Sequence, residues 1–230
     1  ETRDILMWCL RHNVTLRPFY LPGHLNSLAD LLSRSSQVLG TEWTIHVAIF
    51  RQIHSQLPEL DVDLFATSLN NQLPRFISPC PDPAAWKADA FTVEWEQMMP
   101  YAFPPFKLIA EVLKKLRSSP IRMILIAPAW PNQSWYPDLL GLLFDQPLQL
   151  PTWRRLLRQP LGQVYHQNPQ LLQLHAWPLS GLESDRLDFL DRLPSMQPHH
   201  RDLRLSGSTS HIGECSQLGV MNGMSILARP

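Results

Sequence analysis

Residues 107–130, KLIAEVLKKLRSSPIRMILIAPAW, carry the pattern that decides the fold. The first half has apolar side chains at helical spacing and cationic ones on the opposite side, which predicts an amphipathic helix. These apolar residues are Leu108, Ile109, Val112, Leu113 and Leu116. From residue 121 to Pro128 the chain is almost continuously apolar, as in a strand that is buried on both faces. A helix followed directly by such a strand is typical of an α/β protein.

The flanking segments continue this alternation. Residues 46–57 are amphipathic and predict a helix, and residues 60–66, LDVDLFA, predict a short strand. A long loop rich in Pro and Asn follows at residues 67–86, and residues 135–144 predict a further helix. The expected fold class is therefore an α/β protein with a doubly wound sheet.

The N-terminal residues form a separate pattern. Residues 3–12 predict a short helix with one buried face, residues 14–23 a strand, and residues 24–34 a helix. A polar stretch that ends at Gly40 then marks a boundary, so residues 1–36 are expected to be one unit and residues 41–150 another.

Composition excludes several classes of protein. The 230 residues contain 20 Lys and Arg and 20 Asp and Glu, so net charge points to no partner. Three widely spaced cysteines argue against a disulfide framework and favour a reducing, intracellular compartment, the cytoplasm or the nucleus. No apolar run is long enough to span a membrane, so no membrane partner is expected. The chain shows no secretory signal and begins in mid-pattern, as a piece of a longer protein would.

The segment LPGHLNSLADLLSR, residues 21–34, places Asp30 on the predicted helix, away from its apolar stripe. Such a carboxylate can hold one Mg²⁺ of a two-metal phosphodiesterase site, or it can be a solvated helical acid. The segment resembles the C-terminal end of the ribonuclease H domain of gypsy-like and DIRS-like retrotransposons. That resemblance implies a metal-ligand role for Asp30 and a ribonuclease H-like strand-helix fragment at residues 1–36. The other carboxylates would lie upstream, so Mg²⁺ is expected only with the missing ribonuclease H portion.

Five sequence blocks follow one another between residues 42 and 135: EWTIHVAIF, DVDLFATSLNNQLPRF, DAFTVEW, YAFPPF and ILIAPAWPNQSW. Together they resemble the Dam-like adenine methyltransferase domain of some phages and DIRS-type retrotransposons, over roughly residues 41–145. The resemblance implies a Rossmann-like, methyltransferase-type partial sheet that binds S-adenosylmethionine. Asp63, together with Phe65, would form the cofactor side of the pocket.

The block YAFPPF matches the family's Asp/Asn-Pro-Pro-Tyr/Phe loop, which receives the flipped adenine. Pro104 and Pro105 would stiffen the loop, and Phe106 would stack on the base. Phe103 stands where the family has an acceptor for the adenine amine, and a phenyl ring offers none. The alternative is that Phe103 and Phe106 pack against the helix 107–117 and that the prolines start this helix.

Residues 151–230 are expected to be a basic and aromatic linker followed by an irregular, partly disordered tail. Within PTWRRLLRQP, residues 151–160, a short basic stretch could follow a phosphate backbone and stack a base, or it could be a solvated face. The candidate contact residues are Trp153, Arg154, Arg155 and Arg158. Metal-ligand types recur at His199, His200, His211 and Cys215, without the spacing of a structural zinc site.

These patterns lead to one hypothesis and two alternatives. The first is a DIRS-like retrotransposon polyprotein segment, with the tail of the reverse transcriptase and ribonuclease H region and a degenerate Dam-like methyltransferase domain. Its partners would be DNA or an RNA–DNA hybrid and the rest of the polyprotein. The second is a non-enzymatic nucleic-acid-binding or spacer module before a downstream recombinase, and the third is a host-encoded fragment with no element function.

Overall fold

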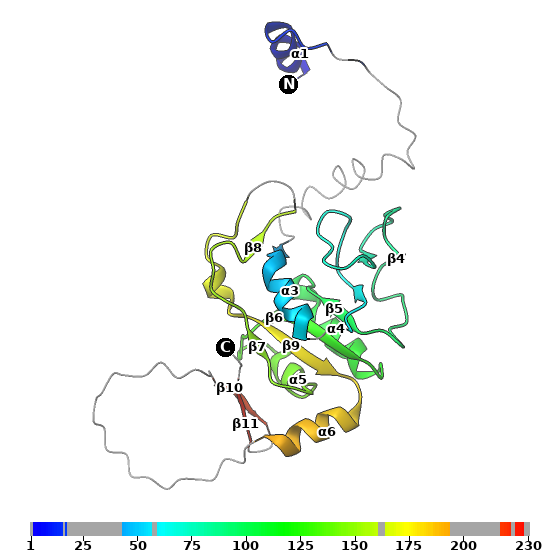
Figure 1. Ribbon diagram of the computed structural model, residues 1–230, viewed down its shortest axis with the longest axis vertical. Helices are drawn as coiled ribbons and strands as arrows, with labels where there is room; N and C mark the ends of the chain where they lie inside the picture. Colours follow the sequence, from blue (N-terminus) through cyan, green and yellow to red (C-terminus); the bar gives the residue numbers. More distant parts are fainter. Residues whose placement is uncertain are drawn as a thin grey trace, which may run out of the picture. The chain divides into compact units, whose positions relative to one another are not determined.

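The computed structural model describes residues 2–15, 17, 43–56, 59–160, 164–193, 217–221 and 224–227 (Figure 1). The chain divides into two compact units, residues 1–34 and residues 35–230, which are described separately.

In the first unit, the helix predicted at residues 3–12 is present as α1 (Thr2–Arg11). Among the apolar side chains of this helix that the structure describes, Ile5, Trp8 and Leu10 are exposed, and Cys9 is buried. Of the predicted strand 14–23, the structure describes residues 14, 15 and 17, and none of them is in a strand. The predicted helix 24–34, with Asp30, lies outside the described residues.

The second unit is built on an open five-stranded sheet with the order β2-β5-β6-β9-β7. The strands β2 (Val62–Asp63), β5 (Pro100–Ala102) and β6 (Arg122–Pro128) are parallel to one another. Strand β9 (Leu174–Ser180) runs antiparallel between β6 and β7 (Leu148–Gln149). The mixed α/β class expected from the sequence is therefore confirmed.

Both faces of this sheet are covered, because alternate side chains of its long strands enter two different apolar clusters. In β6, Met123, Leu125 and Ala127 pack with the helices α4 (Ile109–Arg117), α5 (Tyr136–Leu140) and α6 (Glu183–Arg192). Ile124 and Ile126 point to the other face, where α3 (Val47–Gln56) covers them. A strand buried on both faces reads as a continuous apolar run, which explains the sequence of β6.

The helix predicted at residues 107–117 begins with the 3₁₀ turn η2 (Phe106–Leu108) and continues as α4. The remaining elements are short. They are the strand pair β1 (Thr44–Ile45) with β8 (Leu157–Arg158), the pair β3 (Ile77–Ser78) with β4 (Lys87–Ala88), the 3₁₀ turn η3 (Pro169–Leu172), and the hairpin of β10 (Gln217–Met221) with β11 (Met224–Leu227).

The central sheet of the second unit extends past residue 150, where the sequence predicts the end of the α/β domain. Residues 174–193 were expected in a linker and tail, but they form β9 and α6, and β9 pairs with β6 over its whole length. Trp177 is fully buried there, and its Nε1 donates a hydrogen bond of 2.9 Å to the carbonyl of Ala127. The strand escaped prediction because its pairing partner lies far upstream and because it contains a proline, which usually marks a break.

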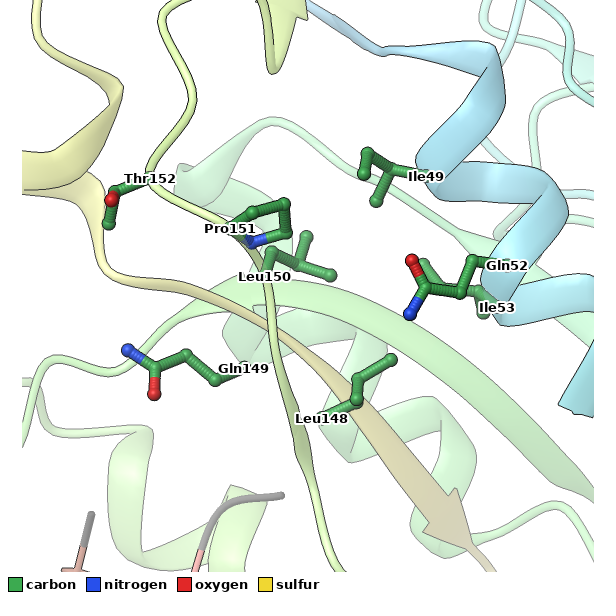
Figure 2. Close-up of a pocket in the computed structure, with 8 residues that line it drawn as sticks. All are labelled: Ile49, Gln52, Ile53, Leu148, Gln149, Leu150, Pro151 and Thr152. Atoms are coloured by element: carbon green, nitrogen blue, oxygen red, sulfur yellow. The ribbon is translucent and has the colours of Figure 1, made fainter. Parts of the chain in front are cut away.

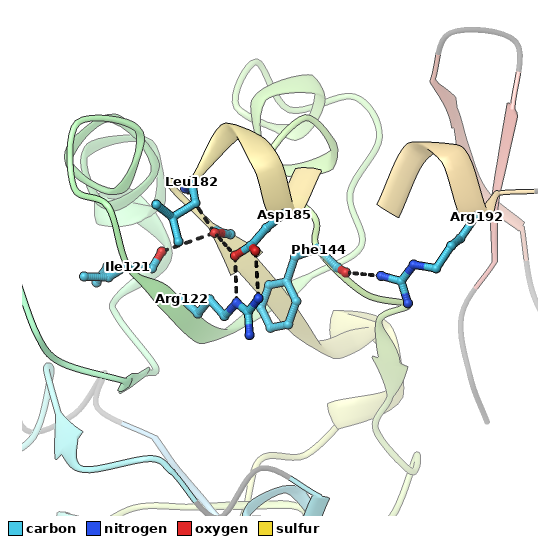
Figure 3. A network of polar contacts seen from close by, with 7 residues as sticks. Ile121, Arg122, Phe144, Leu182, Asp185 and Arg192 are labelled. Carbon is cyan, nitrogen blue, oxygen red and sulfur yellow. Dashed lines mark hydrogen bonds and ion pairs between the residues drawn. The ribbon is translucent and has the colours of Figure 1, made fainter. Parts of the chain in front are cut away.

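An ion pair ties α6 to the start of β6 (Figure 3). The guanidinium of Arg122 donates two hydrogen bonds of 2.7 Å to the two carboxylate oxygens of Asp185. Ser180 Oγ adds a third at 2.8 Å. The bond from Arg122 keeps the pKa of Asp185 below its ordinary value, with Ser180 acting in the same direction. This network therefore fixes the helix that was not expected from the sequence.

Candidate functional site

A cavity of about 660 Å³ lies where β2 and β5 end. Residues 64–66 directly follow β2, residues 103–108 directly follow β5, and both segments line the cavity. The carboxyl ends of parallel strands are the usual ligand-binding edge of an α/β sheet. The other lining residues come from loops and from the start of the unit: Trp43, Asn70, Pro79, Asp89, Ala90 and Phe91.

Five aromatic side chains line this cavity: Trp43, Phe65, Phe91, Phe103 and Phe106. Their rings hold one another in place. Phe65 and Phe91 meet edge to face with ring centroids 5.7 Å apart, and Phe106 meets Trp130 in the same way at 5.3 Å. Phe103 and Phe106 are 6.5 Å apart and tilted by 50°. Such walls suit a flat heteroaromatic ring, which can stack on one phenyl face and meet the edges of others.

The two prolines of YAFPPF lie both at the cavity and at the start of the helix. Pro104 is buried, and both prolines line the cavity. Pro105 also precedes η2, and its carbonyl accepts a hydrogen bond of 2.8 Å from the N–H of Leu108. The prolines therefore begin the helix and shape the cavity wall at once.

Asp63 does not line the cavity. Its side chain is fully buried, with Oδ2 accepting the N–H of Gln72 at 3.0 Å and Oδ1 accepting that of Phe65 at 3.4 Å. Burial raises the pKa of Asp63 to about 7, and the two backbone hydrogen bonds act in the opposite direction. The carboxylate thus bridges both ends of the loop 64–72, which supplies part of the cavity wall. Phe65, the other residue expected on the cofactor side, is in the lining.

The polar groups at the cavity are Asp89, Asn70 and Lys107, which sequence reasoning gave no role. Asp89 is exposed and has a positive φ of 57°, and its Oδ1 accepts the N–H of Phe91 at 3.0 Å. Asn70 Oδ1 accepts hydrogen bonds from the N–H and the hydroxyl of Thr67. Asp89 opens the block DAFTVEW, so the sequence contained a signal for it, whereas Asn70 and Lys107 stand in no recognisable pattern.

The side chain of Lys115 anchors the loop that follows Asp89. Its Nζ donates hydrogen bonds to the carbonyls of Phe91 and Val93, both at 2.6 Å, and to that of Ala90 at 3.3 Å. It also lies 5.0 Å from the ring centre of Trp95. Burial lowers the pKa of Lys115, and the charges of Asp89 and Glu94 oppose this change. One ammonium group therefore satisfies three backbone carbonyls of a loop that has little regular structure.

The predicted nucleic-acid segment is close to the cavity in the fold. Arg158 in β8 pairs with Thr44 in β1, directly beside the cavity residue Trp43. Trp153 is 45% exposed, and its ring meets that of His46 at 4.8 Å. Arg154, Arg155 and Arg158 are exposed. The pairing of β1 with β8 therefore places Arg158 opposite the residue that follows Trp43.

A second cavity, of about 340 Å³, lies between α3 and the strand β7 (Figure 2). Figure 2 shows Ile49 and Ile53 on α3 facing the segment that carries Leu148, Leu150 and Pro151. Its lining has no charged side chain, so it offers no acid, base or metal ligand.

An S-adenosylmethionine molecule would find partial complementarity in the larger cavity. The aromatic walls fit its adenine ring, and the Asp89 carboxylate can accept hydrogen bonds from ribose hydroxyls. The loop after β2 contains no glycine to allow close backbone approach to the rest of the cofactor. For Mg²⁺, no group of three His, Cys, Asp or Glu side chains gathers within the part of the chain that the structure describes. Asp30, His199, His200, His211 and Cys215 lie outside that part.

No helix among the described residues has the length and apolar character needed to cross a membrane. Comparison with protein-family models finds no match, and comparison with curated proteins finds none either.

Proposed function

We propose that the second unit is a degenerate Dam-like methyltransferase domain that binds an adenosine-type ligand without transferring a methyl group. The observation that carries this proposal is the aromatic cavity at the ends of β2 and β5. Its walls come from DLFA and FPPF, the two segments that the resemblance assigns to the cofactor and to the base. The domain then extends to about residue 193, because β9 belongs to its sheet and α6 packs against that sheet.

The sheet combines parallel and antiparallel strands. Three parallel strands are followed by an antiparallel strand that lies between β6 and the last strand, β7. Doubly wound folds often carry an antiparallel strand on an otherwise parallel sheet, so this order is compatible with the Rossmann-like sheet that the resemblance implies.

The loss of transfer follows from Phe103. The amine of adenine needs an acceptor while it attacks the methyl group, and Phe103 presents only a hydrophobic ring to the cavity. Removing a well-placed polar contact from a transition state typically lowers the rate by about 10²–10³. The aromatic walls remain, so binding can persist where transfer does not.

The wider context belongs to the same proposal. We place the chain in a DIRS-like retrotransposon polyprotein, inside the cell, where it follows a reverse transcriptase and ribonuclease H region. Residues 1–36 are then the end of the ribonuclease H domain, with Asp30 as a Mg²⁺ ligand once the missing carboxylates are supplied. DNA or an RNA–DNA hybrid is the expected partner.

The second candidate is a nucleic-acid-binding module without enzymatic function. The exposed arginines of residues 154–158 favour it, because they need no cofactor to bind phosphates. The two candidates agree on the partner and differ on whether the cavity still binds the cofactor.

Calorimetric titration with S-adenosylmethionine and S-adenosylhomocysteine distinguishes them. Binding is expected, and Phe106→Ala should weaken it about tenfold through the loss of one stacking face. Phe144→Ala is the matched control, because Phe144 lies under Arg122, away from the cavity. If neither ligand binds the native chain, or if both variants behave alike, the methyltransferase proposal is wrong and the module is favoured.

A further inference from the structure

Residues 153–160 and 164–166 are connected to the cavity through the strand pair β1-β8. Arg158 is the pairing partner of Thr44, and Trp43, the preceding residue, lines the cavity. His166 meets Trp43 edge on, with ring centres 5.0 Å apart. Tyr165 forms a bridge with Arg158. The strand pairing and the ring contact of His166 thus connect this segment to the cavity residue Trp43.

Basic and aromatic side chains of this segment lie close to one another. The guanidinium of Arg155 lies 5.8 Å from the centre of the Tyr165 ring. Trp153 is supported at one edge by His46 and leaves 45% of its surface exposed. A supported, half-exposed indole beside cations is the arrangement that stacks an unpaired base next to its phosphate.

Within the part of the chain that the structure describes, no acid forms an ion pair with the arginines of this segment, Arg154, Arg155 and Arg158. The sequence contains no Asp or Glu from residue 146 to residue 182. In a chain of zero net charge, such a stretch is a local positive field rather than a general property of the surface.

We propose that Trp153, Arg154, Arg155, Arg158, Tyr165 and His166 form a track for single-stranded nucleic acid that leads one base into the aromatic cavity. Ring faces favour a single strand, because the bases of a duplex are stacked on each other and are not free to stack on Trp153. Three cations match a short run of phosphates. The entry of a base into the cavity rests on the proposed function; binding along the track does not.

The first experiment measures fluorescence anisotropy of a labelled single-stranded oligonucleotide with the full chain over a range of salt concentrations. Three phosphate contacts predict a slope of about −2 for log affinity against log salt, and Arg154→Ala/Arg155→Ala should reduce its magnitude by about 1.4. Trp153→Ala should weaken binding by about 5- to 150-fold. Lys114→Ala/Arg117→Ala removes the same charge from α4 and should change neither quantity.

The result would overturn the track if the duplex of the same sequence binds as tightly as the single strand, or if poly-glutamate competes as well as the oligonucleotide. The same holds if the α4 control loses as much affinity as the track variants. No detectable binding of the native chain would overturn it as well.

The second experiment locates the base. A single strand with one 8-azidoadenine is irradiated on the native chain, and the labelled peptide is identified by mass spectrometry. Label within residues 64–66 or 103–108 is the expected result. Label confined to residues 153–166 leaves the track standing and refutes base entry, irrespective of how the calorimetric titration with the methyl donor turns out.

Discussion

Asp63 makes the free energy of unfolding of this domain depend on pH in a way that an exposed carboxylate would not. Its carboxylate is buried beside Tyr101 in the neighbouring strand, and burial raises the pKa of Asp63 to about 7 from 3.8. Between these two values the folded protein binds a proton that the unfolded chain releases. The free energy of unfolding therefore falls as pH rises through this window.

The magnitude follows from the two pKa values. At about 1.36 kcal/mol per pKa unit, the stability lost by pH 8 is about 4 kcal/mol, and about 3 kcal/mol of it is lost above pH 5. Asp63→Asn removes the titration while keeping the shape of the side chain. Asn can accept only one of the two N–H groups, which lowers stability by about 1 kcal/mol at every pH. Aspartate should thus be the more stable form in acid and asparagine above neutrality.

Urea unfolding followed by tryptophan fluorescence, at several pH values from about 5 to about 8, measures this difference. His175 acts in the opposite direction, because burial lowers its pKa and its neutral form is lost in acid. That contribution is common to both proteins and cancels in their difference. Asp61→Asn, which changes a partly exposed acid in an ion pair with Arg75, should leave the effect of Asp63 in place.

The reasoning is refuted if the stability difference between the native chain and Asp63→Asn stays constant over this range. It is equally refuted if asparagine becomes relatively less stable as pH rises. Either result would mean that the buried carboxylate is ionised throughout and that its two backbone donors outweigh burial.

Three further predictions follow from the contacts described above. Lys115→Met should speed amide hydrogen exchange in residues 89–95 relative to β6, because three carbonyls lose their donor; unchanged exchange would show that the loop holds itself. Tritiated methyl transfer to adenine-containing DNA should be undetectable for the native chain and should appear with Phe103→Asn; robust native transfer would contradict the assigned loss of function. Arg122→Leu should lower the free energy of unfolding by about 3 kcal/mol, because it leaves the Asp185 carboxylate buried without its ion-pair partner. Arg117→Leu, at an exposed ion pair, should lower it by less than about 1 kcal/mol. Equal losses of stability in urea titrations would contradict this prediction.

Local patterns were sufficient for the elements that carry their own periodicity. The helices α3 and α4 and the strand β6 appear where the sequence predicts them, because one face of each helix and both faces of β6 are apolar. Strand β9 could not be found in this way. Its residues LHAWPLS mix polar and apolar types, and its strand conformation depends on pairing with β6.

In the candidate site, too, some features could be predicted from the sequence, and others depend on contacts between distant residues. The sequence placed the segments around Asp63 and Phe103 at one pocket only through the family resemblance; in the structure they meet because the ends of neighbouring parallel strands lie at one edge of a sheet. Trp43 and Asn70 join them through the pairing of β1 with β8 and through loop hydrogen bonds, which leave no trace in residue spacing. The orientation of Asp63 away from the cavity also depended on where the N–H of Gln72 lies, a contact nine residues away.

The place of β9 in the sheet means that β6 is synthesised well before one of its two pairing partners. Strand β6 is complete at Pro128, but the strand that pairs with its outer side begins only at Leu174. At synthesis rates of about 5–20 residues per second, the apolar β6 stays an unprotected edge for some seconds after it is made. Such an edge can recruit strands from other chains. A gene fragment that stops at residue 150 would make this temporary state permanent, so fragments meant to stay monomeric should include residue 193.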